Sequence, residues 1–338
     1  MYGEFDLNGN SGRCPFLNEG GLCSIQIVCG HEALPFVCTN YPRNIHYTPA
    51  VREHTLSPSC EGVLEQLWNL PDGVTFTEDP LPKREWRNMN FSPEGNLSLW
   101  FPPIRELCID LLQDRTMSLT NRMLCLGLIM QSLQQSDWER FNADDWTARM
   151  RDWTHAKETV EPLSSSPGNP VMYLGQNLKV LANLPAWDQT DTIYRALQAN
   201  RSYSMTDQSA PGRVKQKTDF SVSHWQKACA DFDAAFADRE YFFENLMVAV
   251  ALYLAFPDLK SPEALWNSYV SLCSLYSFYR FAAVLGCSDE LSKERLFHMI
   301  VLSSRALLHN RERFAGFQTE LFQHESTSLA HMAILLKG

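Results

Sequence analysis

The chain has 338 residues, of which 45% are hydrophobic, 12% aromatic and 20% charged, and its formal net charge is −10. This composition is typical of a folded globular protein and excludes general disorder. The acidic balance provides no basic field for a nucleic acid backbone, so we expect no nucleic acid partner, although it weakly favours a cationic partner such as a lysine-bearing surface.

The N-terminal sequence MYGEFDLNGNSG has no basic region followed by an apolar run, so it predicts neither a secretion signal nor a transit peptide. The most apolar windows, 246–256 and 123–130, are shorter than the roughly 20 residues needed to cross a bilayer. We therefore expect a cytoplasmic protein without a membrane partner. In that reducing compartment the ten cysteines should be thiols or metal ligands.

Residues 1–62 form the first predicted module, which is rich in Gly, Pro, Asn and Cys. Four cysteines fall between Arg13 and Arg43, and Cys60 follows in the sequence HTLSPSC. Only a short helical turn, around residues 22–27, is indicated by the pattern. We expect an irregular, cysteine-rich, metal-binding or cluster-binding module.

Residues 63–103 are predicted to connect this module to the rest of the chain. A short helix over 62–68 should end before Pro71-Asp72-Gly73, and a proline-rich stretch follows. Beyond it, Ile104, Leu107 and Leu111 repeat at the spacing of an amphipathic helix.

Residues 104–338 read as a helical domain. We expect a second helix capped by Thr120, a third over 142–153, and a boundary between subdomains at the Ser, Pro and Gly-rich segment 161–170. A polar stretch at 199–220 is predicted to be a surface loop. Helices over 241–256 and 264–285 should follow, then one from Ser288 towards Asn310. Strand signals are sparse, so the predicted fold is mainly α, with the cysteine-rich module packed on a multi-helix domain.

The chain has no GxGxxG after a strand, no GxxxxGK[ST], no HExxH and no GxSxG. The usual sequence marks of nucleotide-binding folds, zinc proteases and serine hydrolases are therefore missing.

The cysteines are the remaining chemical signal. Cys14, Cys23, Cys38 and Cys60 are separated by 8, 14 and 21 residues, which is not the CxxC spacing of a zinc knuckle. Thiolates suit zinc or an iron-sulfur cluster, so the residues alone leave open a metal site or a set of small buried thiols. Cysteines within apolar helical stretches are predicted to be structural: Cys108, Cys125, Cys229 and Cys273. Cys287, after a helix end, fits either interpretation.

The runs CPFLNEGGLCSIQ, LPFVCTNYPR and HTLSPSC resemble the cysteine-rich segment of the flagellin lysine N-methylase family, bacterial enzymes that methylate lysine side chains of flagellin. The phrase YFFENLMVAVALYLAFP resembles the C-terminal half of that family. The first run is also similar to a wider group of small cysteine-rich proteins that chelate zinc or iron. This run is therefore more specific evidence for metal binding than for methyl transfer.

This resemblance implies a protein lysine N-methyltransferase that acts on flagellin, with S-adenosylmethionine as methyl donor and an iron-sulfur cluster, but without a Rossmann domain. Cys14, Cys23 and Cys38 match the family's cysteine positions, and Cys60 matches its downstream SC element, whereas Cys29 does not match. Family members have further cysteines upstream, while this chain begins thirteen residues before Cys14. A shortened chain could therefore hold an incomplete cluster.

Methyl transfer to lysine requires a neutral amine, because an ammonium has no lone pair to attack the sulfonium methyl carbon. Tyr41, Glu244 and Asn245 are the candidate catalytic residues, and Arg43 is a candidate for binding the carboxylate of S-adenosylmethionine. The alternatives are a packed turn aromatic at Tyr41, a helix start at Glu244-Asn245, and an exposed ion pair at Arg43. The sequence lacks CxxxCxxC, which favours polar over radical methyl transfer.

A noncatalytic interpretation stays open as well. A zinc-binding helical adaptor for a flagellar or other protein would also use four thiols, with zinc in place of the iron-sulfur cluster.

Overall fold

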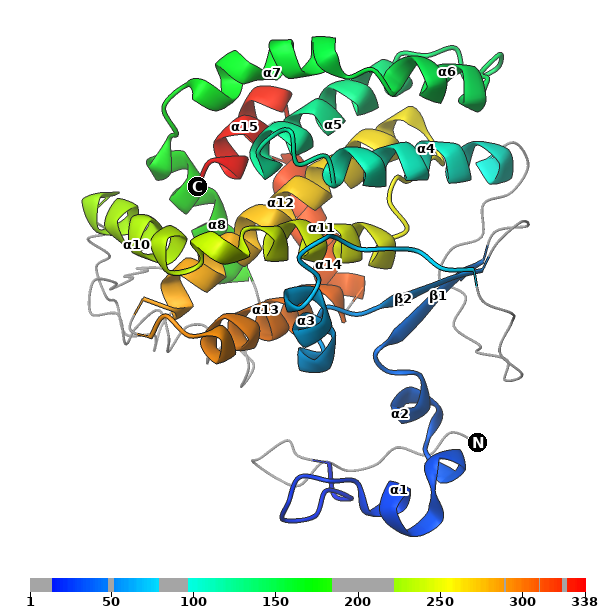
Figure 1. The fold of residues 1–338 in the computed structure, drawn as a ribbon, viewed down its shortest axis with the longest axis vertical. Coiled ribbons are helices and arrows are strands. Elements are labelled where there is room, and N and C mark those ends of the chain that lie inside the picture. The colour runs from blue at the N-terminus through cyan, green and yellow to red at the C-terminus, as the bar shows by residue number, and fades with distance from the viewer. Residues whose placement is uncertain are drawn as a thin grey trace.

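The computed structural model describes residues 14–47, 52–78, 97–183, 222–288, 290–309, 311–323 and 327–338. Helices dominate these residues, which confirms the mainly α fold (Figure 1). None of the described helices combines the length and apolar character needed to cross a membrane. The predicted loop at 199–220 and residues 79–96 of the predicted connection lie outside the described residues.

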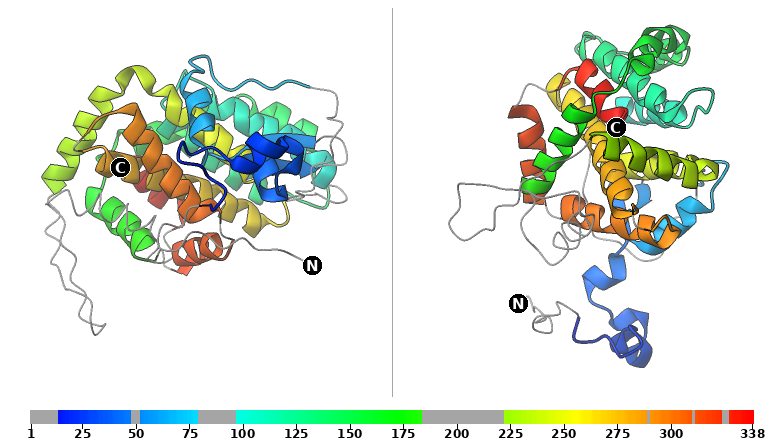
Figure 2. Two further views of the ribbon diagram at one scale, coloured as in Figure 1. Left: turned by 90° about the horizontal axis from the view of Figure 1, so that it is seen from below. Right: turned by 90° about the vertical axis from the view of Figure 1, so that its left-hand side faces the viewer.

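The N-terminal segment consists of short elements that lead to a hairpin. In order these are α1 (Ser24–Cys29), η2 (His31–Ala33), α2 (Phe36–Asn40), β1 (Arg43–Tyr47), β2 (Arg52–Leu56) and α3 (Glu61–Trp68). Figure 1 and the right-hand view of Figure 2 show that α1 and α2 project from the helical body, whereas α3 lies against it. Helix α3 confirms the helix predicted over 62–68.

The hairpin was not predicted. Strands β1 and β2 are antiparallel, with Ile45 opposite His54 and His46 opposite Glu53. In β1, Asn44, Ile45 and His46 are all buried in succession. The strand therefore lacks the alternation of apolar and polar residues by which a half-buried strand is recognised in a sequence.

The helical body contains the remaining described elements. They are α4 (Leu97–Leu112), α5 (Leu119–Gln134), α6 (Ala143–Met150), α7 (Thr154–Ser165), α8 (Pro170–Asn183), α10 (Val222–Ala235), η3 (Ala237–Arg239), α11 (Tyr241–Tyr253), α12 (Pro262–Gly286), α13 (Lys293–Leu308), α14 (Arg311–Gln323) and α15 (Leu329–Leu336). Helix α12 runs through the middle, in contact with α5, α8, α10, α11, α13 and α15. Most of its side chains are buried, so it forms the centre of the core.

Two predicted helix starts were wrong. The cap of α5 is Ser118, whose hydroxyl oxygen accepts a hydrogen bond from the Asn121 amide at 3.2 Å, while Thr120 donates to the Leu336 carbonyl instead. Helix α13 begins at Lys293 and is capped by Ser292 rather than Ser288. In both places two serines or threonines stand near the helix start, and the sequence alone does not say which one adopts the extended cap conformation.

Two segments predicted as connections are partly helical. Helix α4 begins at Leu97 and includes Pro102 and Pro103, because burial of Phe101 in the core holds this turn in place. Helix α7 continues to Ser165, so only 166–169 of the predicted linker separates it from α8. The predicted domain boundaries themselves stay predictions.

Two glycines allow helices of the body to approach closely. A Cβ atom at Gly127 of α5 would lie 2.3 Å from the hydroxyl of Tyr269 on α12, and one at Gly286 would lie 2.3 Å from the side chain of Met299 on α13. Neither position has room for a larger residue unless its neighbour moves.

Candidate functional site

The cysteine-rich segment is organised by a tight turn. The Asn18 amide donates to the Leu22 carbonyl at 2.9 Å, and the Leu22 amide donates to the Asn18 side-chain oxygen at 2.9 Å. Gly21 has a φ of +76°, which a residue with a side chain rarely adopts. The turn brings Leu17 opposite Cys23, so the sequence from Cys14 to Cys23 doubles back on itself.

Three of the four predicted metal ligands lie near one another. Partial desolvation raises the pKa of the exposed Cys38 thiol, and the charges of Cys14 and Cys23 raise it further. Cys60 lies apart from this group, at the N-cap of α3, and Cys29 is exposed at the end of α1. The structure therefore brings together Cys14, Cys23 and Cys38.

These thiols do not form a closed metal site. Within the described ranges, no group of three or more His, Cys, Asp or Glu side chains is arranged so that it could hold a metal ion. The donor type suits zinc or an iron-sulfur cluster, but the arrangement does not fit either one, and we derive no chemical step through a metal.

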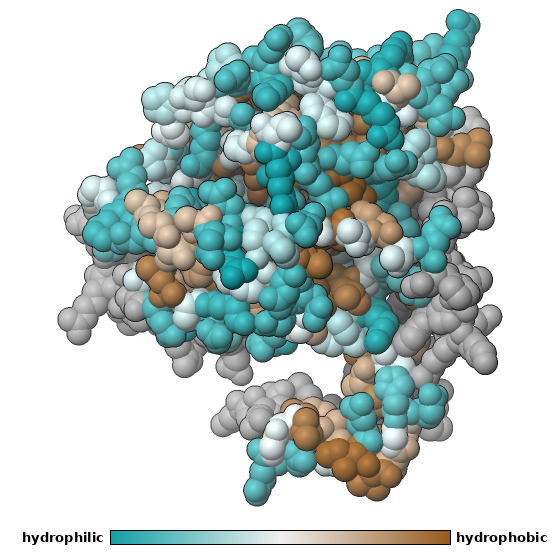
Figure 3. All heavy atoms as spheres, in the orientation of Figure 1, coloured by the Kyte–Doolittle hydropathy of each residue, from teal (hydrophilic) through white to brown (hydrophobic). Residues whose placement is uncertain are grey.

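The segment that carries these cysteines has no core. None of residues 14–38 is buried, and large apolar side chains are exposed instead (Figure 3): Leu22, Ile27, Val28, Phe36 and Val37. A segment this short that buries so little is not expected to hold a fixed structure by itself. A bound metal or a covering surface would supply the missing stabilisation.

Tyr41 belongs to a hydrogen-bonded network beneath this segment. Its hydroxyl donates to the Ser59 carbonyl at 2.8 Å and lies 3.2 Å from the Ser59 hydroxyl. The Ser59 hydroxyl also lies 2.6 Å from Nε2 of His309, at the end of α13, and 2.8 Å from the hydroxyl of Ser57. The network ties the cysteine-rich segment to the helical body. Arg43 is exposed at the start of β1, opposite Leu56.

Glu244 and Asn245 lie at the start of α11, inside the protein. Both oxygens of Glu244 accept hydrogen bonds from Arg115, and one of them also accepts from Arg122 at 2.7 Å. The Asn245 side-chain amide donates to the carbonyls of Leu67 and Leu70, each at 2.9 Å. These contacts join α3 and the connection after it to α5 and α11.

A second buried charge cluster lies under the hairpin and was not predicted. Arg105 of α4 is 3% exposed, and its Nη2 lies 2.8 Å from Oε2 of Glu53 on β2. His46 is 1% exposed, and its Nε2 lies 3.1 Å from the carbonyl of Tyr253. Burial, together with the charge of Arg105, lowers the pKa of His46 to about 4, so this imidazole is neutral at neutral pH. This cluster was not predicted because its members come from the hairpin and α4, too far apart in the sequence to form a recognisable motif.

An open pocket of about 600 Å³ lies between α3 and the start of α13. Four carboxylates line it, with two cations, a histidine and an aromatic ring: Glu61, Gly62, Glu65, Glu290, Lys293, Glu294, Arg295, Phe297 and His298. We call it the acidic pocket. Cys60, the N-cap residue of α3, stands immediately before the pocket residue Glu61 in the sequence. Its sulfur lies 3.7 Å from the point where a Cβ atom added to Gly62 would be.

Two features of the acidic pocket matter for chemistry. Burial, followed by the charge of Arg295, lowers the pKa of His298 below its usual value, which favours a neutral imidazole. Lys293 pairs with Glu65 at 2.9 Å, while the other carboxylates face a space large enough for a side chain and a small molecule. Sequence reasoning missed His298, because a single histidine in a helix carries no signal of its own.

The cysteines of the helical body have the expected structural role. Cys108, Cys125, Cys229 and Cys273 are buried, as is Cys287. Burial raises the pKa of Cys108 and Cys287 to about 12, so these thiols stay protonated. A protonated thiol is a poor nucleophile at neutral pH.

The family model described as the FliB lysine N-methylase C-terminal domain matches residues 105–335, from α4 to α15. The chain belongs to this family. The match confirms the resemblance to the flagellin lysine N-methylases. The cysteine-rich segment and α3 precede the matched range.

Two curated relatives match this chain over shorter stretches than the family model does. The Lysine-N-methylase of Salmonella typhimurium is 32% identical over 93 residues, which are 27% of this chain and 23% of the relative. The Flagellar biosynthetic protein FliU of Salmonella muenchen is 37% identical over 78 residues, which are 23% of this chain and 46% of FliU. The chain thus matches less than half the length of either relative. No solved structure matches.

Proposed function

We propose that the protein is an S-adenosylmethionine-dependent lysine N-methyltransferase that acts on flagellin in the cytoplasm. The family match over residues 105–335 carries this proposal. The names of the relatives, Lysine-N-methylase and Flagellar biosynthetic protein FliU, support the reaction and a flagellar substrate.

The acidic pocket suits the lysine acceptor. Glu61, Glu290 and Glu294 attract an ammonium group, while Glu65 is already paired with Lys293, and Phe297 provides an apolar surface for the lysine methylenes. The same carboxylates favour the charged amine, however, so a proton acceptor is needed before transfer. Neutral His298 is the residue in the pocket suited to that task.

The reaction then balances without a further group. The lysine ammonium gives one proton to His298, which becomes an imidazolium. The amine lone pair forms the new N–C bond to the methyl group, the S–C bond breaks, and its electron pair stays on the sulfur as a neutral thioether. The methylated amine carries the positive charge that the sulfonium loses.

The methyl donor suits the same lining. Its sulfonium and amino groups are cationic and complement Glu61, Glu290 or Glu294, while its carboxylate complements Arg295. Arg43 stays the alternative carboxylate ligand proposed from sequence.

The catalytic roles of Tyr41, Glu244 and Asn245 also stay predictions. Their contacts favour a different role for each, because Tyr41 bonds to Ser59, Glu244 is held by two arginines, and Asn245 binds two carbonyls. We infer that they position the hairpin and α3 next to the acidic pocket.

The resemblance to the family's cysteine-rich segment makes this segment the proposed location of an iron-sulfur cluster, with Cys14, Cys23 and Cys38 as ligands and Cys60 as a fourth. The thiols of Cys14, Cys23 and Cys38 lie near enough for their charges to interact, but closing a site around a cluster requires the segment to rearrange. Zinc is the alternative metal. A zinc-bound, noncatalytic adaptor is the alternative function, and the exposed apolar side chains of the segment favour it.

Anaerobic purification separates the two functions. A brown protein that absorbs near roughly 400 nm and transfers labelled methyl groups to flagellin supports the methyltransferase with a cluster. A colourless protein with stoichiometric zinc that binds flagellin without labelling it supports the adaptor. A version extended upstream by the cysteine-containing segment of a relative tests whether additional thiols complete the cluster.

A further inference from the structure

Lys293 places an amine of the protein itself in the acidic pocket. It is the first residue of α13, and its Nζ donates to both carboxylate oxygens of Glu65 on α3, at 2.9 and 3.2 Å. The same Nζ lies 5.7 Å from the centre of the Phe297 ring. A carboxylate and the face of an aromatic ring are the partners that the pocket offers to a substrate lysine. Lys293 therefore makes, from within the chain, the contacts expected of an acceptor lysine.

The proton acceptor needed for methyl transfer lines the same pocket as this amine. His298 lies five residues farther along α13. Burial, followed by the charge of Arg295, lowers the pKa of His298, so its imidazole is available in the neutral form. The Lys293 side chain is 33% exposed, so the pocket holds its amine without closing it off from a small molecule.

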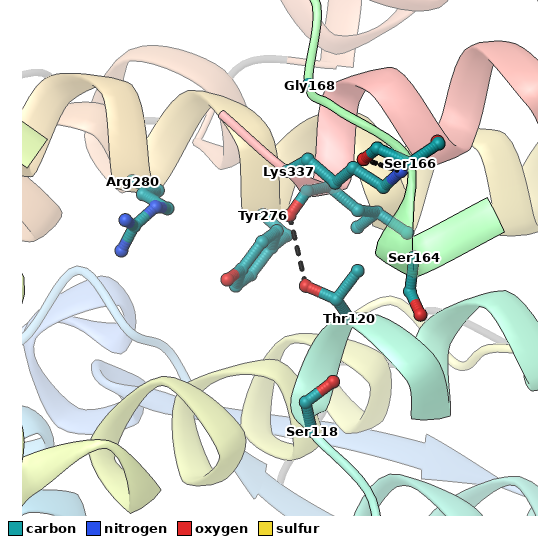
Figure 4. A pocket seen from close by; sticks show the side chains of 9 residues that line it. Ser118, Thr120, Ser164, Ser166, Gly168, Tyr276, Arg280 and Lys337 are labelled. Atoms are coloured by element: carbon teal, nitrogen blue, oxygen red, sulfur yellow. Dashed lines mark hydrogen bonds between the residues drawn. The ribbon is translucent and has the colours of Figure 1, made fainter. Parts of the chain in front are cut away.

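Lys337 provides a contrasting case in the same protein. It lines a second pocket of about 440 Å³, between the start of α5, the end of α7, α12 and the end of α15 (Figure 4). Its Nζ donates to the carbonyl and the hydroxyl of Ser166, at 2.9 and 2.7 Å, and desolvation lowers its pKa. The described lining of this pocket includes no His, Asp or Glu. The pKa of Lys337 thus favours a neutral amine, but its pocket provides neither a base nor a carboxylate.

We propose that Lys293 is a self-methylation site, at which the chain transfers a methyl group from S-adenosylmethionine to its own Lys293 Nζ in the acidic pocket. This inference rests on the proposed function, because it uses the same methyl donor, base and pocket. The Lys293 ammonium gives a proton to His298, and the amine lone pair forms the N–C bond to the methyl group. The S–C bond breaks, and its electron pair stays on the sulfur as a neutral thioether. The monomethylated amine carries a positive charge and still pairs with Glu65.

The test is incubation of the metal-reconstituted full chain with S-adenosylmethionine carrying a deuterated methyl group, followed by mass spectrometry of the chain's own peptides. We expect label on Lys293. Lys337 should carry none, and neither should Lys260, an exposed lysine that pairs with Asp258 at 3.1 Å outside the pocket. Because the acceptor lies in its own pocket, the fraction labelled at a given time should not change when the protein is diluted about tenfold at constant donor.

Variants make the test specific. K293R keeps a cation beside Glu65 but removes the acceptor amine, so the label at this position should disappear. H298Q should slow the labelling of Lys293 at least about a hundredfold, as expected on loss of a general base, whereas H155Q, at an exposed histidine, should behave like the wild type. Melting curves verify that each variant is folded.

A parallel reaction with flagellin separates the inference from the proposed function. Label on flagellin but not on Lys293 overturns the inference and leaves the proposed function standing. Label on Lys293 but not on flagellin supports the inference and removes flagellin as the substrate, and no label on either overturns both. Labelling of Lys293 that slows about tenfold on dilution shows transfer between molecules and overturns the inference. Equal labelling in H298Q, or of Lys337, shows spontaneous alkylation and also overturns it.

Discussion

At the scale of single residues, the carboxylate of Glu244 lies between the guanidinium groups of Arg115 and Arg122, with 2% of its side chain exposed. Removing one partner of a buried ion pair leaves the other charges uncompensated inside the protein. Glu244 was selected from the sequence as a polar residue in an apolar helix. The structure shows that Glu244 is buried and paired with two arginines. Its partners, Arg122 on α5 and Arg115 in the loop before it, could not be identified from the sequence.

We expect E244Q to lower the free energy of unfolding by about 3 kcal/mol, measured by urea denaturation. The control is R151Q, at the exposed pair between Arg151 and Asp110, which should cost less than about 1 kcal/mol. Equal losses in the two variants would contradict a structural role for Glu244. If activity per folded molecule is also lost in E244Q, the catalytic assignment is supported.

His46 predicts a pH dependence of stability. Its pKa is about 4 in the folded protein, against 6.5 for an unperturbed histidine, so the unfolded chain binds a proton first as the pH falls. The stability is fully present above pH 6.5 and is lost between 6.5 and about 4, by about 3 kcal/mol. Burial raises the pKa of Glu53 in the folded protein. The contribution of Glu53 to the free energy of unfolding therefore increases as the pH falls, opposite to that of His46.

Comparing the wild type with H46N isolates this contribution from that of Glu53. The difference in unfolding free energy between the two proteins, measured by urea denaturation from pH 7 to 4, should shrink as the pH falls. A difference that does not change with pH would show that His46 titrates normally.

His298 predicts a pH dependence of the rate. The proposed base must be neutral, so kcat should rise with pH through the pKa of His298, which burial and Arg295 place below that of a free imidazole. H298Q should lower kcat by about 10² to 10⁴-fold, the usual contribution of a general base, with a smaller change in KM. The exposed His155 provides the control H155Q. A normal rate in H298Q would exclude His298 as the base.

At the scale of elements, the cysteine-rich segment and the helical body differ in what holds them together. Helix α12 is buried along most of its length, while α1 contains no buried residue. The helices of the body were predictable from sequence, α4 by its 3.6-residue apolar period, and α11 and α12 as long apolar runs that stop at Pro257 and Gly286. The hairpin was not predictable, because β1 is stabilised by contacts with α11 and β2 by a contact with α4, and both helices are distant in sequence.

This difference predicts a selective effect of chelation. Removing bound metal should expose residues 14–38 to proteolysis, because none of them is buried, but should leave the melting temperature of the helical body nearly unchanged. Limited proteolysis with mass spectrometry, with and without chelator, measures both regions at once. The variant C38S should behave like the chelated protein, and C29S like the wild type. Cooperative melting of the whole chain on chelation would contradict the prediction.

At the scale of the whole molecule, four carboxylates from two distant parts of the chain gather in one pocket. This acidic pocket lies between α3 and the start of α13, next to Cys60. The net charge of −10 weakly favoured a cationic partner but gave no position for a binding site. The family could be recognised from the sequence through the cysteine runs, whereas the acidic pocket depends on side chains that only the fold brings together.

The central claim is that this chain transfers a methyl group from S-adenosylmethionine to flagellin lysines at the acidic pocket. The most direct measurement is mass spectrometry of flagellin after incubation with the metal-reconstituted protein and S-adenosylmethionine carrying a deuterated methyl group. The account predicts deuterated methyl groups on lysine ε-amino nitrogens, lost in H298Q and retained in H155Q. Unmodified lysines, or equal labelling by H298Q, would contradict it.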